Sequence, residues 1–304
     1  MGFEELLREI TEDRIHGARY LSRRALEAVK LVVKEAEAED LEDFMEMLKW
    51  AGRRLIEARP SMASIASQTA RYIYELARVA PEVGLERLRS YALSRAEEMV
   101  RELGSAGIGA ASNGAELIRD GLKVMSCSYS STVHLTLTKA WRGGKRFRVY
   151  IAESLSLSRS GSRGGVSYGR VMAGKLEGGL NVEVIPDGEI RRFMDKMDMV
   201  LVGADMVKPD GSIVNGTPTW LLAYHAQMQG KPFYVVCETY KFDARPLIGV
   251  EEALEEGFDL IPAEWVREIV TERGPIKPEK AREICEEFEA ALKLLLDPKW
   301  ARGT

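Results

Sequence analysis

Side chains that suit the binding of an anion follow apolar runs in the second half of the sequence. A hydroxyl-rich turn, 126–132, leads into a helical segment, and a Ser/Gly/Arg run, 154–165, contains Arg159 and Arg163. Backbone N–H groups at a helix start, together with hydroxyl and guanidinium groups, suit a phosphate. Asp205 comes directly after an apolar run, where a carboxylate can transfer a proton or bind a sugar hydroxyl. These residues predict a site for a phosphorylated metabolite.

A simpler interpretation of the same residues stays open. Ser and Thr in turns often only cap helices, and Arg residues in a glycine loop are often solvated. Asp205 is harder to explain in this way, because it follows a run typical of a buried strand. Further polar candidates after the apolar runs are Cys127, Ser128, Glu153, Asn215 and Lys241.

Several other kinds of site are not indicated. The sequence has no GxxxxGK[ST] phosphate loop and no GxSxG nucleophile motif. Gly107-Ile108-Gly109 precedes the first apolar run, whereas a dinucleotide fingerprint must follow a strand. The three cysteines are far apart and the three histidines are isolated, so we expect neither a disulfide framework nor a metal site. No cofactor is expected.

The elements that position these residues alternate in type after residue 121. Apolar runs rich in β-branched residues predict strands, and each interval between them is long enough for one helix. This alternation predicts βαβ units and a parallel sheet, in which ligands bind beyond the carboxyl ends of the strands. The strands are predicted at 122–126, 147–152, 181–185, 198–203 and 232–237, and the helices at 131–141, 166–178, 188–197 and 217–229. Thr217 is predicted to cap the last of these helices, with Pro218 in its first turn.

The first 120 residues have helical periodicity and no strand-like alternation. Helices are predicted at 22–37, 41–57, 61–79 and 82–103, with Pro60 and Pro81 marking helix starts. The tail, 263–295, is also predicted to be helical. The predicted fold class is α/β, with a helical N-terminal domain, 1–120, followed by a Rossmann-like open parallel sheet and C-terminal helix, 121–304.

Composition limits the class of protein. Apolar residues make up 45% of the chain, which is enough for a core and excludes general disorder. The formal charge of −4 argues against a direct nucleic-acid partner. No signal peptide or membrane span is indicated, so we expect a cytoplasmic protein. Few Asn and Gln beside many Glu and Arg are typical of a thermophile.

Four motifs resemble one superfamily. They are Val200-Leu-Val-Gly-Ala-Asp205, Asp210-Gly211-Ser-Ile-Val-Asn215-Gly216-Thr217, Glu238-Thr-Tyr-Lys-Phe242 and Glu272-Arg-Gly-Pro-Ile-Lys-Pro278. The superfamily contains the regulatory subunits (alpha, beta and delta) of translation initiation factor 2B. It also contains two sugar-phosphate isomerases, for ribose-1,5-bisphosphate and for methylthioribose-1-phosphate. The resemblance implies a helical domain followed by a Rossmann-like domain, assembly as a homo-oligomer (dimer or hexamer), and translation factors as further partners.

The resemblance also implies roles for single residues. The isomerases use a Cys after the first strand and an Asp after the fourth, which correspond here to Ser128, with Cys127 beside it, and Asp205. A serine hydroxyl has a far higher pKa than a thiol and shuttles protons poorly. The isomerases' Arg-Gly-Ala phosphate turn reads His16-Gly17-Ala18 here, and Gly216 and Leu155 stand where they carry Lys and Arg. The residues assigned to the ligand are Gly17, Ala18, Arg59, Glu153, Arg159, Arg163, Asn215 and Lys241.

Two functions follow. The first is a regulatory, oligomeric protein related to initiation factor 2B that binds a phosphorylated sugar or nucleotide. The second is an aldose–ketose isomerase of the ribose-1,5-bisphosphate type that uses Asp205 with Cys127 or Ser128. The choice between regulator and enzyme stays open on the sequence.

Overall fold

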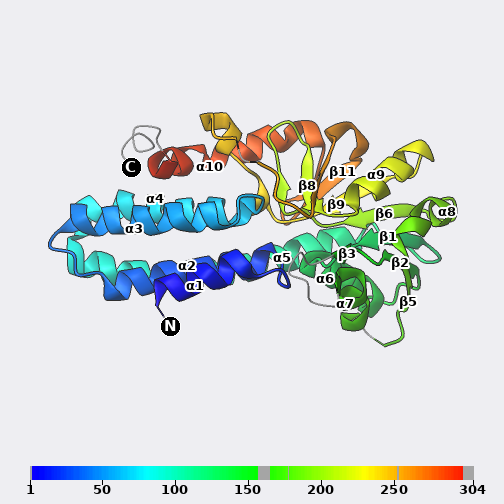
Figure 1. Cartoon of the computed structure of the whole chain (residues 1–304), viewed down its shortest axis with the longest axis horizontal. Coiled ribbons are helices and arrows are strands. Elements are labelled where there is room, and N and C mark those ends of the chain that lie inside the picture. The colour runs from blue at the N-terminus through cyan, green and yellow to red at the C-terminus, as the bar shows by residue number, and fades with distance from the viewer. Residues whose placement is uncertain (1, 157–164, 177, 252, 297–304) are drawn as a thin grey trace. The chain divides into compact units, whose positions relative to one another are not determined.

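The computed structural model describes residues 2–156, 165–176, 178–251 and 253–296 (Figure 1). The chain divides into two compact units. Unit 1 comprises residues 1–105, 240–253 and 282–304, and unit 2 comprises residues 106–239 and 254–281.

Unit 1 is helical. Its helices are α1 (Phe3–Glu12), α2 (Ala18–Glu35), α3 (Leu41–Ala58), α4 (Ala63–Val83), the first part of α5 (Leu85–Ala115) and α10 (Ala281–Leu296). The predicted helix 22–37 falls on α2, and its apolar residues Ala25, Val29 and Val33 are buried, at most 1% exposed. Asp40 caps α3 by accepting a hydrogen bond from the backbone N–H of Asp43. Amphipathic helices therefore build this unit, as their periodicity predicts.

The helix start at Pro81 was predicted wrongly. Pro81 does not begin a helix but lies in the last turn of α4. The helix ends after Val83, where Gly84 has φ 72°, a left-handed conformation that glycine adopts without steric cost. The glycine, and not the proline, therefore separates α4 from α5.

Unit 2 contains a seven-stranded sheet of order β12-β11-β9-β6-β1-β2-β5. Six strands are parallel, and only β12 pairs antiparallel, with β11. In chain order the parallel strands run 3-2-1-4-5-6, the doubly wound arrangement whose order reverses between β1 and β6. Ligands of such folds bind beyond the carboxyl ends of the strands at that reversal. The strands are β1 (Lys123–Cys127), β2 (Arg148–Ala152), β5 (Asn181–Ile185), β6 (Met199–Val202), β9 (Phe233–Val236), β11 (Glu268–Thr271) and β12 (Gly274–Ile276).

Helices connect the strands of unit 2 (Figure 1). They are the end of α5, α6 (Ser131–Arg142), α7 (Tyr168–Lys175), α8 (Ile190–Met194) and α9 (Thr219–Met228). One buried cluster joins α5, α6 and α7 to one face of the sheet through Val124, Val149 and Leu201. Side chains alternate along a strand, so Cys127 points to the opposite face, where its thiol meets Thr219 of α9. The predicted fold class, a helical region followed by a mostly parallel α/β sheet, is confirmed.

Three local elements differ from the sequence prediction. Residues 263–276 are not helical but hold a short 3₁₀ turn and the strands β11 and β12. A second, antiparallel sheet of β7 (Met206–Val207), β8 (Ile213–Gly216) and β10 (Phe258–Ile261) was not predicted, because its strands are too short to show a period. Thr217 does not cap α9, since its hydroxyl donates to Asp259, which also accepts from the backbone N–H of Trp220.

Candidate functional site

The turn after β1 places Ser128 at the reversal of strand order. Ser128 has φ 57°, in the left-handed region that non-glycine residues rarely adopt. Its backbone N–H donates to the hydroxyl of Ser154, over 2.7 Å. A Cβ atom built on Gly216 would lie 3.1 Å from the Ser128 hydroxyl oxygen, so this hydroxyl lies against the end of β8. The strained conformation is typical of functional sites.

The turn after β2 supports the turn after β1. Ser154 is also left-handed, with φ 52°, and is 2% exposed. Its hydroxyl donates to the carbonyl of Ala152 while it accepts from Ser128. The carboxylate of Asp187 accepts from the backbone N–H groups of Ser154 and Leu155, over 2.8 and 3.2 Å. Asp187 and Ser154 therefore fix the backbone beside Ser128, a role that the sequence analysis did not assign to them.

Asp205 follows β6 at the other side of the reversal. Its backbone N–H donates to the carbonyl of Val214, over 2.9 Å, which ties the residue to β8. The residue is half-buried. On the same strand β8, Asn215 is 7% exposed, and its amide donates to the hydroxyl of Thr219, over 2.8 Å. Asp205 and Asn215 therefore lie on one short antiparallel ladder.

The thiol of Cys127 belongs to the packing between β1 and α9. Its Sγ lies 3.2 Å from the hydroxyl of Thr219, and the residue is 3% exposed. Burial raises the pKa of the Cys127 thiol to about 12, although the hydrogen bond with Thr219 opposes this shift. A thiol with this pKa is protonated at neutral pH and is a poor general base or nucleophile.

Glu153 and the start of α7 lie at the carboxyl end of β2. The Glu153 carboxylate accepts from Arg170, over 2.8 Å, and the Glu153 carbonyl accepts from the Ser167 hydroxyl. Gly169 lies so close to the strand that an added Cβ atom would be 2.1 Å from the carbonyl oxygen of Ala152. Only glycine allows this approach.

The remaining predicted ligand residues are distributed as follows. Gly17, Ala18, Arg59 and Lys241 belong to unit 1. Gly17 is the N-cap residue of α2, and Ala18 is the first residue of that helix. Arg59 and Lys241 are buried, and a guanidinium nitrogen of Arg59 donates to the carbonyl of Asp13, over 2.6 Å. Arg159 and Arg163 lie outside the described residues. Unit 2 thus holds Cys127, Ser128, Glu153, Asp205 and Asn215.

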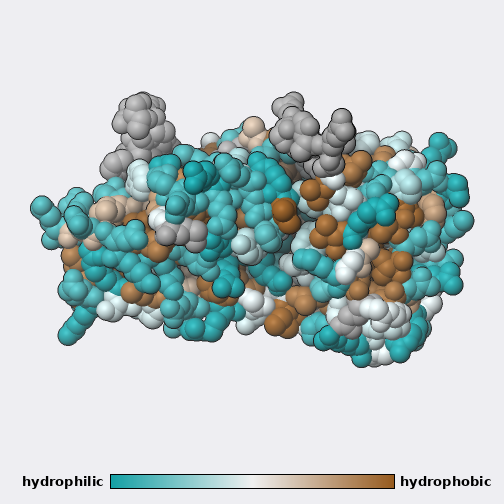
Figure 2. Space-filling model, turned by 60° about the horizontal axis from the view of Figure 1, so that its bottom comes forward, coloured by the Kyte–Doolittle hydropathy of each residue, from teal (hydrophilic) through white to brown (hydrophobic). Residues whose placement is uncertain are grey.

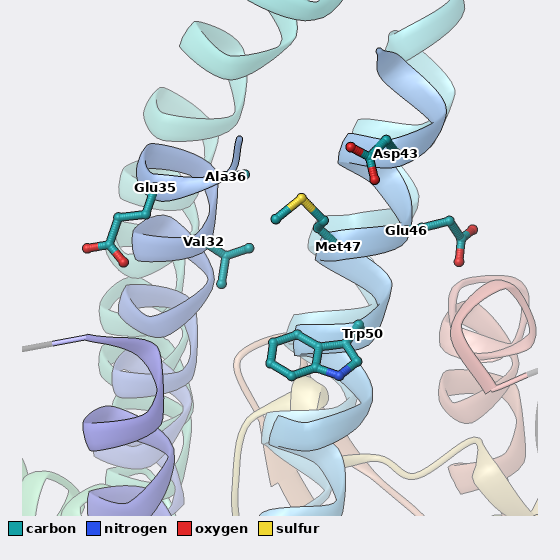
Figure 3. Close-up of a pocket in the computed structure, with 7 residues that line it drawn as sticks. All are labelled: Val32, Glu35, Ala36, Asp43, Glu46, Met47 and Trp50. Carbon is teal, nitrogen blue, oxygen red and sulfur yellow. The ribbon is translucent and has the colours of Figure 1, made fainter. Parts of the chain in front are cut away.

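A separate pocket of about 460 Å³ lies between α2 and α3 in unit 1 (Figure 3). Val32 of α2 and Met47 of α3 point toward each other across it, and the indole of Trp50 extends into the same space. Its lining residues are Val32, Glu35, Ala36, Asp43, Glu46, Met47 and Trp50. Of the predicted ligand residues that the structure describes, none lines this pocket.

Neither a group of metal ligands nor a membrane-spanning helix occurs within the described residues. In the ranges given above, no three His, Cys, Asp or Glu side chains group as ligands of a metal ion would. Among the helices of the same ranges, none has both the length and the apolar character that crossing a bilayer requires.

The fold and the site define the class of protein. Unit 2 is a doubly wound α/β unit whose polar residues gather where the strand order reverses, an arrangement typical of small-molecule binding. The model of the Initiation factor 2 subunit family matches residues 14–257. The chain therefore belongs to this family, and the superfamily expected from its motifs is confirmed.

Individual relatives include both kinds of protein that the motifs resemble. An eIF-2B subunit 2-like translation initiation factor of Pyrococcus horikoshii is 35% identical over 90% of this chain and 96% of its own. A ribose 1,5-bisphosphate isomerase of Thermococcus kodakarensis is 28% identical over 95% of both chains. The crystal structure of the Pyrococcus horikoshii OT3 translation initiation factor eIF-2B has a TM-score of 0.74 and 32% identity, covering 91% of this chain and 98% of that one.

Proposed function

We propose that the chain is a regulatory member of its family that binds a phosphorylated sugar or nucleotide without converting it. The ligand would lie at the carboxyl ends of β1 and β6, against Ser128, Asp205 and Asn215. In this proposal the occupancy of the site, and not a product, carries the signal.

The observation that carries the proposal is the state of Cys127. An isomerase that works with a thiol and a carboxylate needs a thiol that can gain and lose a proton near neutral pH. The Cys127 thiol faces Thr219 inside the packing of α9, and burial raises its pKa to about 12. Ser128 takes the position after β1, and a serine hydroxyl ionises too rarely to replace a thiol. The acid–base pair therefore lacks one partner.

Ligand binding needs less than catalysis and is compatible with the residues present. Ser128 offers a hydroxyl next to Gly216 of β8, Asn215 on the same strand offers an amide, and Asp205 can accept hydrogen bonds from sugar hydroxyl groups. Gly216 lets the end of β8 approach the Ser128 hydroxyl closely, since an added Cβ atom there would lie 3.1 Å from the hydroxyl oxygen. These features support a site for the sugar part of the ligand.

The test is to offer ribose 1,5-bisphosphate to the pure full-length chain and to follow ribulose 1,5-bisphosphate by NMR. We expect binding and no turnover. Turnover by the wild type would favour the isomerase over the regulator if Asp205→Asn abolishes it and the control variant Asn181→Asp retains it. Asn181 begins β5, at the opposite end of the strand from the proposed site.

The isomerase is the second candidate, and Asp205 favours it. This carboxylate is only half-buried and follows β6 at the reversal of strand order, as a catalytic base of this fold would. A hydroxide or a ligand oxygen would then have to take the place of the missing thiol as the second acid–base group beside Asp205.

We also propose that the protein acts as a homo-oligomer (dimer or hexamer) in the cytoplasm, with translation factors as partners. Hydrophobic residues, brown in Figure 2, gather on the visible face of unit 2. Exposed apolar residues of unit 2 include Ile108, Trp220, Met228 and Leu260, at 42–61% exposure. Such residues support contacts between protein chains. Multi-angle light scattering of the wild type and of Met228→Glu tests the proposed homo-oligomer. A monomeric wild type would contradict it.

A further inference from the structure

The surface of α2 and α3 in unit 1 is covered by α1 in one part and open in the next. α1 packs on both helices and buries Phe3, Leu6, Leu7 and Ile10. The ring of Phe3 lies 5.3 Å from the ring of Trp50, which also lines the pocket of about 460 Å³ between α2 and α3. The pocket therefore begins where α1 ends, and α1 shows which kind of segment this surface accepts.

The charges beside α1 match those that it carries. Arg24 of α2 donates to the carboxylate of Glu9, over 2.9 Å. Arg54 of α3 donates to both carboxylate oxygens of Glu4, each over 3.1 Å. α1 is thus an amphipathic helix whose apolar face lies on α2 and α3, and whose acidic residues meet an arginine on each of the two helices.

The open part is also apolar at its centre. Val32 of α2 and Met47 of α3 point toward each other, and the indole of Trp50 extends into the space between them (Figure 3). Trp50 is 47% exposed, which is a large fraction for an indole on a helix that already buries a core stripe. Apolar side chains of a second segment would cover this indole as Phe3 covers its other part.

The charges beside the open part have the opposite sign to those beside α1. The pocket is lined by the carboxylates of Glu35 on α2 and of Asp43 and Glu46 on α3. Residues 35–46 contain seven acidic side chains and no Lys or Arg. Glu35 is the last residue of α2, where the helix dipole favours a positive charge nearby. A segment that docks here as α1 docks next to it must therefore be basic.

The cations of this region are engaged elsewhere or compensate only one carboxylate. Lys49 pairs with Glu46, over 2.7 Å. Arg89 donates to the carbonyls of Val33 and Ala36 at the end of α2, over 2.9 and 2.7 Å. Within the described part of the chain, the side chain of Glu35 makes neither an ion pair nor a hydrogen bond.

We propose that this pocket docks a basic amphipathic helix of another protein. Its apolar residues would lie between Val32 and Met47, against Trp50, and its Lys or Arg residues would pair with Glu35 on one side and Asp43 on the other. From Asp43 to Trp50 the surface of α3 rises about 10 Å, at 1.5 Å per residue, so it accommodates about two turns of a helix with apolar residues at i and i+3 or i+4. The contact is separate from the phosphorylated ligand in unit 2.

The arrangement of the carboxylates favours a helix over a small organic cation. Figure 3 shows Glu35 and Glu46 extending from α2 and α3 away from each other. A single small cation in the apolar centre would meet neither of them, whereas a helix carries basic side chains on both flanks of its apolar face.

Fluorescence anisotropy with a synthetic probe tests the proposal. The probe is a labelled helical peptide with Leu at i, i+3, i+4 and i+7 and Lys on both flanks, and the control peptide has Glu in place of each Lys. We expect the full-length chain to bind the lysine peptide at least about tenfold more tightly than the glutamate peptide. The indole NMR signal of Trp50, assigned with Trp50→Phe, should shift when the lysine peptide is added.

Two charge reversals show whether the pocket is the binding site. Glu35→Lys replaces attraction by repulsion at the pocket and should raise the Kd of the lysine peptide roughly threefold to tenfold. The variant should fold, because a lysine suits the last turn of a helix. Glu12→Lys is the matched control, since Glu12 is also an exposed last residue of a helix, at the end of α1 remote from Phe3, and it should leave the Kd unchanged. Met47→Glu, a second variant, should weaken binding more than tenfold.

The remaining outcomes would overturn the proposal. They are no binding of the lysine peptide, equal affinity for the two peptides, or an equal loss in Glu35→Lys and Glu12→Lys, which would show attraction to the acidic chain as a whole. A shift of the Trp50 signal by phenethylamine but not by the lysine peptide would also overturn it, and would assign the pocket to a small cation. None of these results bears on the binding of ribose 1,5-bisphosphate.

Discussion

Modification of the cysteines in the folded protein tests directly whether Cys127 can act as an acid or base. All three cysteines, Cys127, Cys237 and Cys285, are buried. With a pKa of about 12, Cys127 has a thiolate fraction on the order of 10⁻⁴ at pH 8, while an ordinary thiol with a pKa near 8.5 has about one quarter. The thiolate fraction alone therefore slows the reaction with a disulfide reagent by roughly three orders of magnitude, before any loss of access.

The assay is the release of thionitrobenzoate at pH 8, from the native protein and from protein in guanidinium chloride. We expect almost no fast release from the native chain and release from three thiols after unfolding. The double variant Cys237→Ala with Cys285→Ala assigns any native signal to Cys127. One thiol of that variant reacting at the rate of a free thiol in the native state would refute the reasoning, and would return Cys127 to the list of catalytic candidates.

Three further substitutions test local parts of the structure. Gly169→Ala places a Cβ atom 2.1 Å from a carbonyl oxygen and should lower the free energy of unfolding, measured in urea, by more than about 2 kcal/mol. In the same helix, Gly174→Ala adds a Cβ atom with no neighbouring atom within 4 Å and should be neutral or stabilising. Equal stability of the two variants would contradict the close packing. Ser154→Ala removes the acceptor of the Ser128 backbone N–H and should cost roughly 1–3 kcal/mol, again by urea unfolding; a loss below about 0.5 kcal/mol would show that this bond does not hold the turn. Burial raises the pKa of the Asp13 carboxyl, but hydrogen bonds from the following residues outweigh it, so the pKa lies below its ordinary value. The stabilisation by Asp13 is then complete above about pH 4 and is lost as the pH falls through the lowered pKa. Asp13→Asn should therefore have a lower free energy of unfolding than the wild type at neutral pH, and this difference should shrink in acid. A difference that does not change with pH would contradict this.

The sequence predicts the fold well because the hydrophobic periodicity of the chain indicates most of its helices and strands. Long amphipathic helices and strands buried on both faces leave strong patterns, and the five predicted strands coincide with β1, β2, β5, β6 and β9 to within about two residues. The shorter elements leave none, so β7, β8 and β10 escaped prediction. Pro81 misled the prediction because a proline near the end of a helix looks the same in sequence as one at a helix start.

The sequence predicts less of the candidate site than of the fold. The turn after β1 and the acid after β6 follow from the rule that ligands bind at the carboxyl ends of parallel strands. The supporting roles of Ser154 and Asp187 arise from contacts across 26 and 33 residues of chain, which no local pattern reveals. The direction of the Cys127 thiol depends on where β1 ends, and a shift of one residue would reverse it. The predicted roles of Arg159 and Arg163 stay predictions.

The most direct test of a ligand site at the strand reversal is a crystal structure of the full-length chain soaked in ribose 1,5-bisphosphate. The account predicts electron density for the ligand beside Ser128 and Asn215, with the Asp205 carboxylate within hydrogen-bond distance of a sugar hydroxyl. A ligand bound elsewhere, or an Asp205 side chain turned into the packing with no space before it, would contradict the account.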